Sequence, residues 1–200
     1  MLANEMVPGT KLVGLAELVN SGRPAFAGAY RVVIIGTVRA VEFFDKQKRG
    51  GTESIALKDV QVLPYQTGQI AKSVVGSGQE IISGPFTGCV MSVFRQNQSV
   101  WAGHVDTNPD TTQRGSYDQL KSGGGVKLIS EYDSAGKIPV ELKSMHVIFC
   151  IADTGGIRSF LVKMESSGVS VLQKANPMFG QKTDMWVVGA QTVYTVVRGI

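Results

Sequence analysis

The sequence contains few of the features that define several large protein classes. Its 200 residues include two cysteines and two histidines, and the cysteines, Cys89 and Cys150, do not form a CxxC pair. A disulfide-rich fold and a structural zinc site are therefore not expected, because each requires more such residues. Charged residues make up 18% of the chain, with a net charge of +4. This modest, scattered charge does not indicate a nucleic-acid-binding protein.

Long apolar runs and targeting patterns are also absent from the sequence. No apolar stretch approaches the length of a membrane-spanning helix. The first residues lack the charged and apolar segments of a classical signal peptide. The basic cluster at residues 46–49 has no interleaved aromatic residues, which indicates a solvated loop. We therefore expect a soluble protein with no membrane span, no nucleic-acid partner, no metal and no other cofactor.

Glycine and β-branched residues are abundant instead. The 24 glycines indicate many turns. Most of the predicted strands are apolar, β-branched segments without helical punctuation. These segments are residues 30–44, 54–63, 126–132, 145–152, 157–164, 169–172 and 185–197.

Helical patterns are confined to two places in the chain. Residues 10–20 have leucines at helical spacing after a possible capping threonine, and residues 110–121 follow a similar capped start. Residues 66–79 are polar and rich in glycine, which is typical of a loop. The sequence thus predicts one catalytic domain over residues 1–200. Its expected class is α+β, with a mostly antiparallel β-sandwich-like core flanked by a few short helices.

The candidate chemistry lies near the middle of the chain. An apolar segment follows Cys89, turns near Gln96 and Asn97, and returns to His104. With an even-numbered turn centred there, antiparallel pairing places Cys89 directly opposite His104, with Cβ atoms about 4.5–5.5 Å apart. At that separation an imidazole can accept a thiol proton. A three-residue turn would instead place the two side chains on opposite faces.

This arrangement predicts nucleophilic catalysis on a carbonyl group. His104 takes the proton and lowers the pKa of the thiol, and Cys89 attacks the carbonyl carbon. Backbone N–H groups near Gly88 stabilise the oxyanion, with Thr87 beside them. A further group is needed to orient the imidazole, and Ser83, Thr87 and Asp106 are the candidates. In the alternative interpretation Cys89 is buried and inert, and the protein is a non-enzymatic β-sandwich binding module.

The segment FTGCVMSVFRQNQSVWAGHVD resembles the active-site segment of bacterial protein glutamine deamidase toxins. These are of the Burkholderia lethal factor and cytotoxic necrotising factor type, and the chemoreceptor glutamine deamidases are more distantly similar. Ser83 occupies a position where some members have an assisting threonine. The other matching positions are Thr87, Gly88, Cys89, Trp101, His104 and Asp106.

The resemblance implies a specific reaction and setting. It implies conversion of a protein glutamine side chain to glutamate, with release of ammonia, through a thioester at Cys89. It identifies Cys89, His104 and Ser83 as the catalytic residues, with Thr87 and Gly88 at the oxyanion. It also implies a toxin or virulence effector. Because a classical signal peptide is absent, we expect export by a non-classical route, and we expect a monomer. Such an effector acts in the target-cell cytosol on a small GTPase or a translation factor. A cysteine protease and a transglutaminase use the same dyad, and both remain alternatives.

Overall fold

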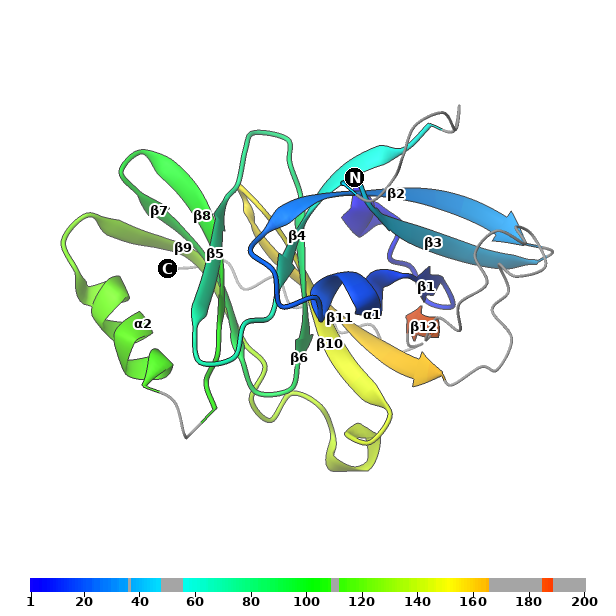
Figure 1. Cartoon of the computed structure of the whole chain (residues 1–200). Helices are drawn as coiled ribbons and strands as arrows, with labels where there is room; N and C mark the ends of the chain where they lie inside the picture. The colour runs from blue at the N-terminus through cyan, green and yellow to red at the C-terminus, as the bar shows by residue number, and fades with distance from the viewer. Residues whose placement is uncertain (36, 48–55, 109–111, 166–184, 189–200) are drawn as a thin grey trace.

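The computed structural model describes residues 1–35, 37–47, 56–108, 112–165 and 185–188 (Figure 1). The helical elements in these residues are η1 (Leu2–Asn4), α1 (Leu15–Val19), α2 (Gln113–Ser122) and η2 (Val140–Leu142). The strands are β1 (Lys11–Val13), β2 (Phe26–Ile35), β3 (Val38–Asp45), β4 (Lys58–Pro64), β5 (Ile70–Val74), β6 (Ile81–Phe86), β7 (Val90–Gln96), β8 (Ser99–Val105), β9 (Val126–Asp133), β10 (His146–Asp153), β11 (Gly156–Glu165) and β12 (Met185–Val188).

These strands form two sheets that lie side by side (Figure 1). One sheet closes into a barrel in the order β1-β12-β11-β10-β6-β4-β2-β3. Its pairs are antiparallel except for β1 with β3 and β4 with β6, which are parallel. The second sheet has the order β5-β8-β7-β9 and is antiparallel throughout. The predicted α+β class with a mostly antiparallel, sandwich-like core is confirmed, although the closure of one sheet was not predicted.

One hydrophobic cluster joins the barrel to the second sheet. Its side chains are buried because the strands of both sheets direct alternate residues into the space between them. The barrel contributes β4, β6, β10 and β11, and the second sheet contributes all four of its strands. Representative members are Leu63, Phe86, Ile148, Met91, Val93, Ala102 and Tyr132. The face of the second sheet that meets this cluster is called its inner face below.

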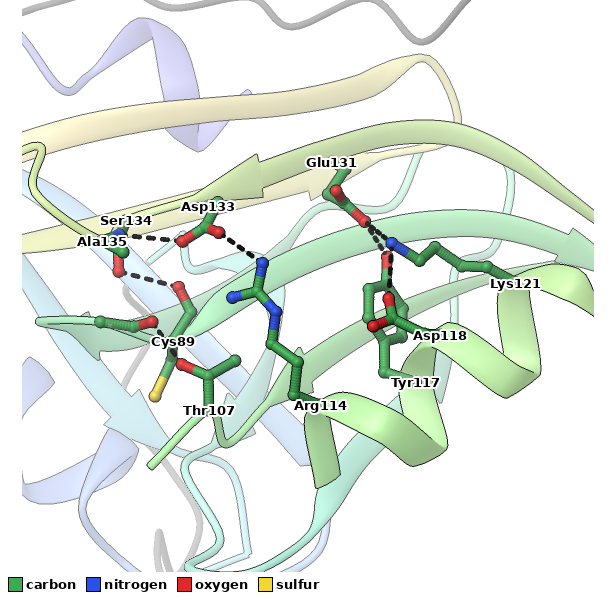
Figure 2. Close-up of polar contacts among 11 residues, drawn as sticks. Cys89, Thr107, Arg114, Tyr117, Asp118, Lys121, Glu131, Asp133, Ser134 and Ala135 are labelled. Atoms are coloured by element: carbon green, nitrogen blue, oxygen red, sulfur yellow. Dashed lines mark hydrogen bonds and ion pairs between the residues drawn. The ribbon is translucent and has the colours of Figure 1, made fainter. Parts of the chain in front are cut away.

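Helix α2 covers the outer face of the second sheet (Figures 1 and 2). Tyr117 is buried there, and its hydroxyl lies 2.7 Å from Ser92 Oγ and 2.5 Å from Glu131 Oε2. The same carboxylate accepts a hydrogen bond of 3.1 Å from Lys121 Nζ. Buried polar groups in this helix–sheet contact are thus paired, which holds the helix in place.

Two local predictions from the sequence were wrong. The helix predicted over residues 10–20 begins at Leu15, because residues 11–13 form strand β1 between β3 and β12. Gly14 separates the two elements with φ of 76°, and a Cβ there would lie 2.8 Å from the Phe43 carbonyl oxygen. The loop predicted over residues 66–79 contains β5. Among the described residues, no helix is long and apolar enough to cross a membrane.

Candidate active site around Cys89 and His104

The hairpin of β7 and β8 sets the positions of the two candidate catalytic residues. Its turn consists of Asn97 and Gln98, with φ values of 49° and 65°, as a two-residue turn with two left-handed residues requires. Gln96 therefore pairs with Ser99, and Met91 pairs with His104. The prediction that Cys89 lies directly opposite His104 is wrong by two residues. The turn lies one residue later than predicted, because Asn tolerates the left-handed region at the first turn position.

A shift of two residues preserves the face on which each side chain lies. Met91 faces the inter-sheet cluster, and Cys89, two residues earlier, packs against the same cluster. His104 is opposite Met91 and is therefore on the inner face as well. The pair of β7 and β8 farthest from the turn is Val90 with Val105. One position farther from the turn, Cys89 is therefore at the level of Asp106. Cys89 and His104 are thus diagonal neighbours on one face.

Ser83 determines which nitrogen of His104 has the proton. Ser83 Oγ donates its only proton to the Leu63 carbonyl oxygen, at 2.6 Å. It lies 2.9 Å from His104 Nδ1, and in that contact it must accept. The proton of the neutral imidazole is therefore on Nδ1, and Nε2 has the free lone pair. Nε2 is buried and has no hydrogen-bond partner among the described residues.

Aromatic rings enclose the imidazole. The Phe86 ring stacks on it with 4.0 Å between centroids, and the Tyr65 ring lies 5.3 Å away at a tilt. Burial lowers the pKa of His104 to about 3, and the nearby Asp106 carboxylate only partly opposes this effect. His104 is consequently a neutral base across the physiological range. Its Nε2 lone pair is available to accept a proton.

Cys89 lies just before β7 and is partly exposed. Its carbonyl oxygen accepts hydrogen bonds from Ser134 N at 3.1 Å and Ser134 Oγ at 2.8 Å. The Thr107 hydroxyl donates to the Gly88 carbonyl oxygen (Figure 2). These bonds connect the backbone around the thiol to the β8–α2 connection and to the end of β9. The position of the backbone at Gly88 and Cys89 is therefore fixed by two separate segments.

The electrostatic surroundings of Cys89 do not activate it in this structure. Burial raises the pKa of its thiol, and the negative charges of Asp106 and Asp133 raise it further. The Thr107 backbone N–H acts in the opposite direction but does not outweigh them. The sequence-based prediction that His104 lowers this pKa is thus wrong for the protein without substrate. Both members of the candidate dyad are neutral at pH 7.

Asp106 organises the loops beside the dyad. Its carboxylate accepts hydrogen bonds from Gly68 N at 2.7 Å and Asn108 N at 3.0 Å. Burial acts to raise its pKa, but these bonds, together with one from the Tyr65 hydroxyl, lower it below its ordinary value. Asp106 is therefore a buried anion held in place by neighbouring donors. Sequence reasoning missed Tyr65, because no pattern in the chain connects a residue that follows β4 to the β7–β8 hairpin.

The remaining predicted site residues are near the dyad but not in contact with the imidazole ring. Thr87 is exposed and Gly88 partly buried, in the bend between β6 and β7. A Cβ at Gly88 would have no atom within 4 Å, so this backbone is open to an approaching molecule. Of the residues predicted to orient His104, Ser83 makes the hydrogen bond, and Thr87 has no hydrogen bond to it among the described contacts.

Neither a metal site nor a similar protein identifies the function of this site. In the described part of the chain, no group of three or more His, Cys, Asp or Glu side chains is placed to hold a metal ion. No family model, curated protein or solved structure matches the chain. The function must therefore be argued from the geometry of the site.

The depressed pKa of His104 predicts a pH dependence of stability. In the unfolded chain the histidine takes up a proton below its ordinary pKa of 6.5, whereas in the folded protein its pKa is about 3. The free energy of unfolding should therefore fall as the pH is lowered from about 6.5 towards 3, by up to about 1.4 kcal/mol per pH unit. Urea unfolding at pH 7.5 and pH 5 should show a loss on the order of 2 kcal/mol from this group.

The matched variant for this test is His104→Asn, whose amide N–H can still donate to Ser83 Oγ. Without a titrating imidazole, the variant should lose less stability than the wild type between the two pH values. Equal losses in both proteins would show that His104 is exposed to solvent in the folded state.

Proposed function

We propose that this protein is a cysteine-dependent amidohydrolase that converts a glutamine side chain of a target protein to glutamate. The observation that carries the proposal is the buried Nε2 of His104. Its tautomer is set by Ser83, it has no hydrogen-bond partner among the described residues, and it is on the same face as Cys89. An unpartnered buried polar atom costs free energy, and such an atom is retained at catalytic sites that use it.

The proposed reaction proceeds by proton transfer between neutral groups. As Cys89 Sγ attacks the carboxamide carbon, its proton passes to His104 Nε2, and the carbonyl oxygen becomes an oxyanion. Backbone N–H groups at the open bend of Thr87 and Gly88 stabilise that oxyanion. The imidazolium then protonates the leaving nitrogen, the C–N bond breaks, and ammonia and a thioester form. Water, deprotonated by Nε2, hydrolyses the thioester to the glutamate side chain and the free thiol.

Substrate binding completes the dyad in this proposal. No hydrogen bond joins the Cys89 thiol to His104 among the described contacts, and catalytic hydrogen bonds often form only when substrate is bound. Diagonal neighbours on a sheet face remain within reach of long side chains. A rotation of the Cys89 side chain over the inner face is the movement that the mechanism requires.

The sequence resemblance supports the same reaction and adds a biological setting. The segment around Cys89 and His104 is similar to that of bacterial glutamine deamidase toxins, and Ser83 takes the place of their threonine. We propose on this ground a toxin or effector acting on a host small GTPase or translation factor. Cysteine protease and transglutaminase activities differ from deamidation in the group that leaves and in the molecule that resolves the thioester.

Three product measurements on one sample test the proposal. The protein is incubated with a eukaryotic cell extract, in parallel with the Cys89→Ser variant. Free ammonia and conversion of glutamine to glutamate in tryptic peptides indicate deamidation. Incorporation of a labelled primary amine indicates a transglutaminase, and new backbone termini indicate a protease. If none of these products depends on Cys89, the proposal is wrong.

The raised thiol pKa gives a prediction for chemical labelling. Iodoacetamide should alkylate Cys89 slowly at pH 7, and the rate should rise with a midpoint above the free-thiol value of about 8.5. Because His104 is neutral and forms no ion pair with the thiol, His104→Asn should leave this midpoint unchanged. Cys150, which is fully buried, serves as the internal control and should label only after unfolding. A midpoint below about 8 that rises in His104→Asn would instead reveal a preformed thiolate–imidazolium pair.

The same raised pKa favours a second candidate function, a binding module with an inert thiol. In that case extracts should show no Cys89-dependent change in any glutamine. Cys89→Ser would then alter only the free energy of unfolding.

A further inference from the structure

Strand β5 is at one end of the second sheet and pairs only with β8 among the described strands. Two backbone hydrogen bonds at its ends establish which groups face β8. Val75 N donates to Val100 O at 2.8 Å, and Asp106 N donates to Gln69 O at 3.2 Å. In an antiparallel ladder, hydrogen-bonded positions alternate along the strand. Lys72 and Val74 therefore direct their N–H and C=O groups away from β8.

These four outward groups are available to a ligand. No hydrogen bond from another described residue reaches the backbone of Lys72 or Val74. Both residues are exposed, Val74 to 44%. Exposed edge strands of this kind are templates for pairing with another extended chain.

A cleft of about 660 Å³ runs along this edge. One wall is β5, from Lys72 to Val74, and the opposite wall is β4, from Asp59 to Gln61. A hydrogen bond of 2.7 Å from Gln61 Nε2 to Ser73 Oγ joins the two walls. The volume of the cleft is within the range of ligand-binding sites, and its lining includes three consecutive residues of the β5 edge, Lys72 to Val74.

The side chains beside the edge define the chemistry of a partner. Lys72 Nζ lies 5.2 Å from the centre of the Trp101 ring, and no carboxylate of the described residues forms an ion pair with it. The nearest acidic groups of the cleft are already engaged: Asp59 pairs with Lys46, and the Glu80 carboxylate accepts from backbone N–H groups of η1. Lys72 thus has no carboxylate partner among the described residues, and it lies two residues from the exposed, apolar Val74 on the same face.

We propose that the outer edge of β5 binds an extended segment of a partner protein by strand addition. The segment has an acidic side chain at the position opposite Lys72 and an apolar one opposite Val74. In an antiparallel arrangement the partner sequence is an apolar residue followed two positions later by an acidic one. Main-chain hydrogen bonds to Lys72 and Val74 provide the affinity, and the two side chains provide the selectivity. Because this binding requires no chemistry at Cys89, it goes beyond the proposed reaction.

The test uses the blocked peptide Thr-Thr-Val-Thr-Glu-Thr-Thr as probe and the full chain labelled with ¹⁵N. Upon saturation, the amides of Lys72 and Val74 should gain protection from hydrogen exchange by about 10-fold or more. The amides of Ala71 and Ser73 already bond to β8 and should change little. Protection at another surface, or none at millimolar peptide, would overturn the proposal.

One protein variant and one modified peptide test backbone pairing. Val74→Pro removes an outward N–H and the valine side chain but no hydrogen bond to β8, and proline is tolerated on edge strands in that orientation, so affinity should fall about 10-fold or more while the fold is retained. If this variant fails to fold, the peptide methylated on the amide nitrogens of its Val and Glu gives the same test and should not bind. Equal binding of the methylated peptide would overturn strand addition. Cys89→Ser should bind the peptide as the wild type does. A missing deamidase activity can therefore be distinguished from a missing peptide-binding site at β5.

Discussion

Replacing Cys89 with serine is expected to reduce glutamine deamidation by about 10³-fold or more while leaving the fold intact. A neutral hydroxyl is a much weaker nucleophile than the thiol it replaces, and it does not form a thioester. The substitution changes one atom in a partly exposed side chain, so the free energy of unfolding should change little. The measurement is the rate of ammonia release from the substrate found in extract, together with circular dichroism of the variant.

Two control variants show whether the effect belongs to the dyad. Cys150→Ala removes the other thiol, which is fully buried in strand β10, and should retain activity despite some loss of stability. His104→Asn retains a donor for Ser83 but has no basic nitrogen, and should be as inactive as Cys89→Ser. A folded, active His104→Asn protein would contradict the assignment of His104 as the base.

Replacing Ser83 with alanine is expected to affect both stability and activity. The hydroxyl is completely buried and satisfies two groups, the Leu63 carbonyl oxygen and the Nδ1–H of His104. Each of these groups would lose its partner in the core, at about 1–3 kcal/mol apiece. Without the hydroxyl, nothing keeps the proton on Nδ1, so deamidation should fall by about 10²-fold or more. Urea unfolding and the ammonia assay measure the two effects.

The tautomer of His104 shows whether Ser83 positions the imidazole or has a purely structural role. In the wild type, ¹⁵N-imidazole NMR of His104 should show the proton on Nδ1, and Ser83→Ala should show a mixture or the reverse. Ser83→Thr keeps the hydroxyl and should restore both the tautomer and most of the activity, at some cost in packing. If Ser83→Ala is destabilised but retains the tautomer and the rate, Ser83 has a structural role only.

Much of the fold was predictable because local patterns and tertiary packing agree. The hairpin of β10 and β11 and strand β9 occur where apolar, β-branched residues predict them. Helix α2 occurs where it was predicted, but it begins at Gln113, three residues later than expected, and its N-cap Thr112 makes no side-chain capping hydrogen bond. The predicted strand over residues 169–172 lies outside the described residues, and of the strand predicted over residues 185–197 the described part, Met185–Val188, forms β12.

Other elements were missed because tertiary contacts outweighed local preference. Residues 11–13 belong to a segment with leucines at helical spacing, but they form strand β1. This strand lies between β3 and β12 and completes the barrel. Strand β5 lies within residues 66–79, which are polar and rich in glycine as a loop is, and the strand exists because β8 provides a partner along its length. Such pairing depends on residues distant in sequence, which periodicity within a short window does not reveal.

The sequence by itself determined that Cys89 and His104 are on one face of one hairpin for any even-numbered turn. This follows from the alternation of side chains, which an even-numbered shift in register does not change. Only the tertiary structure decided that the two residues are diagonal neighbours, because the turn at Asn97 and Gln98 sets the register. It also decided their ionisation, since the burial of both groups between the two sheets disfavours their charged forms.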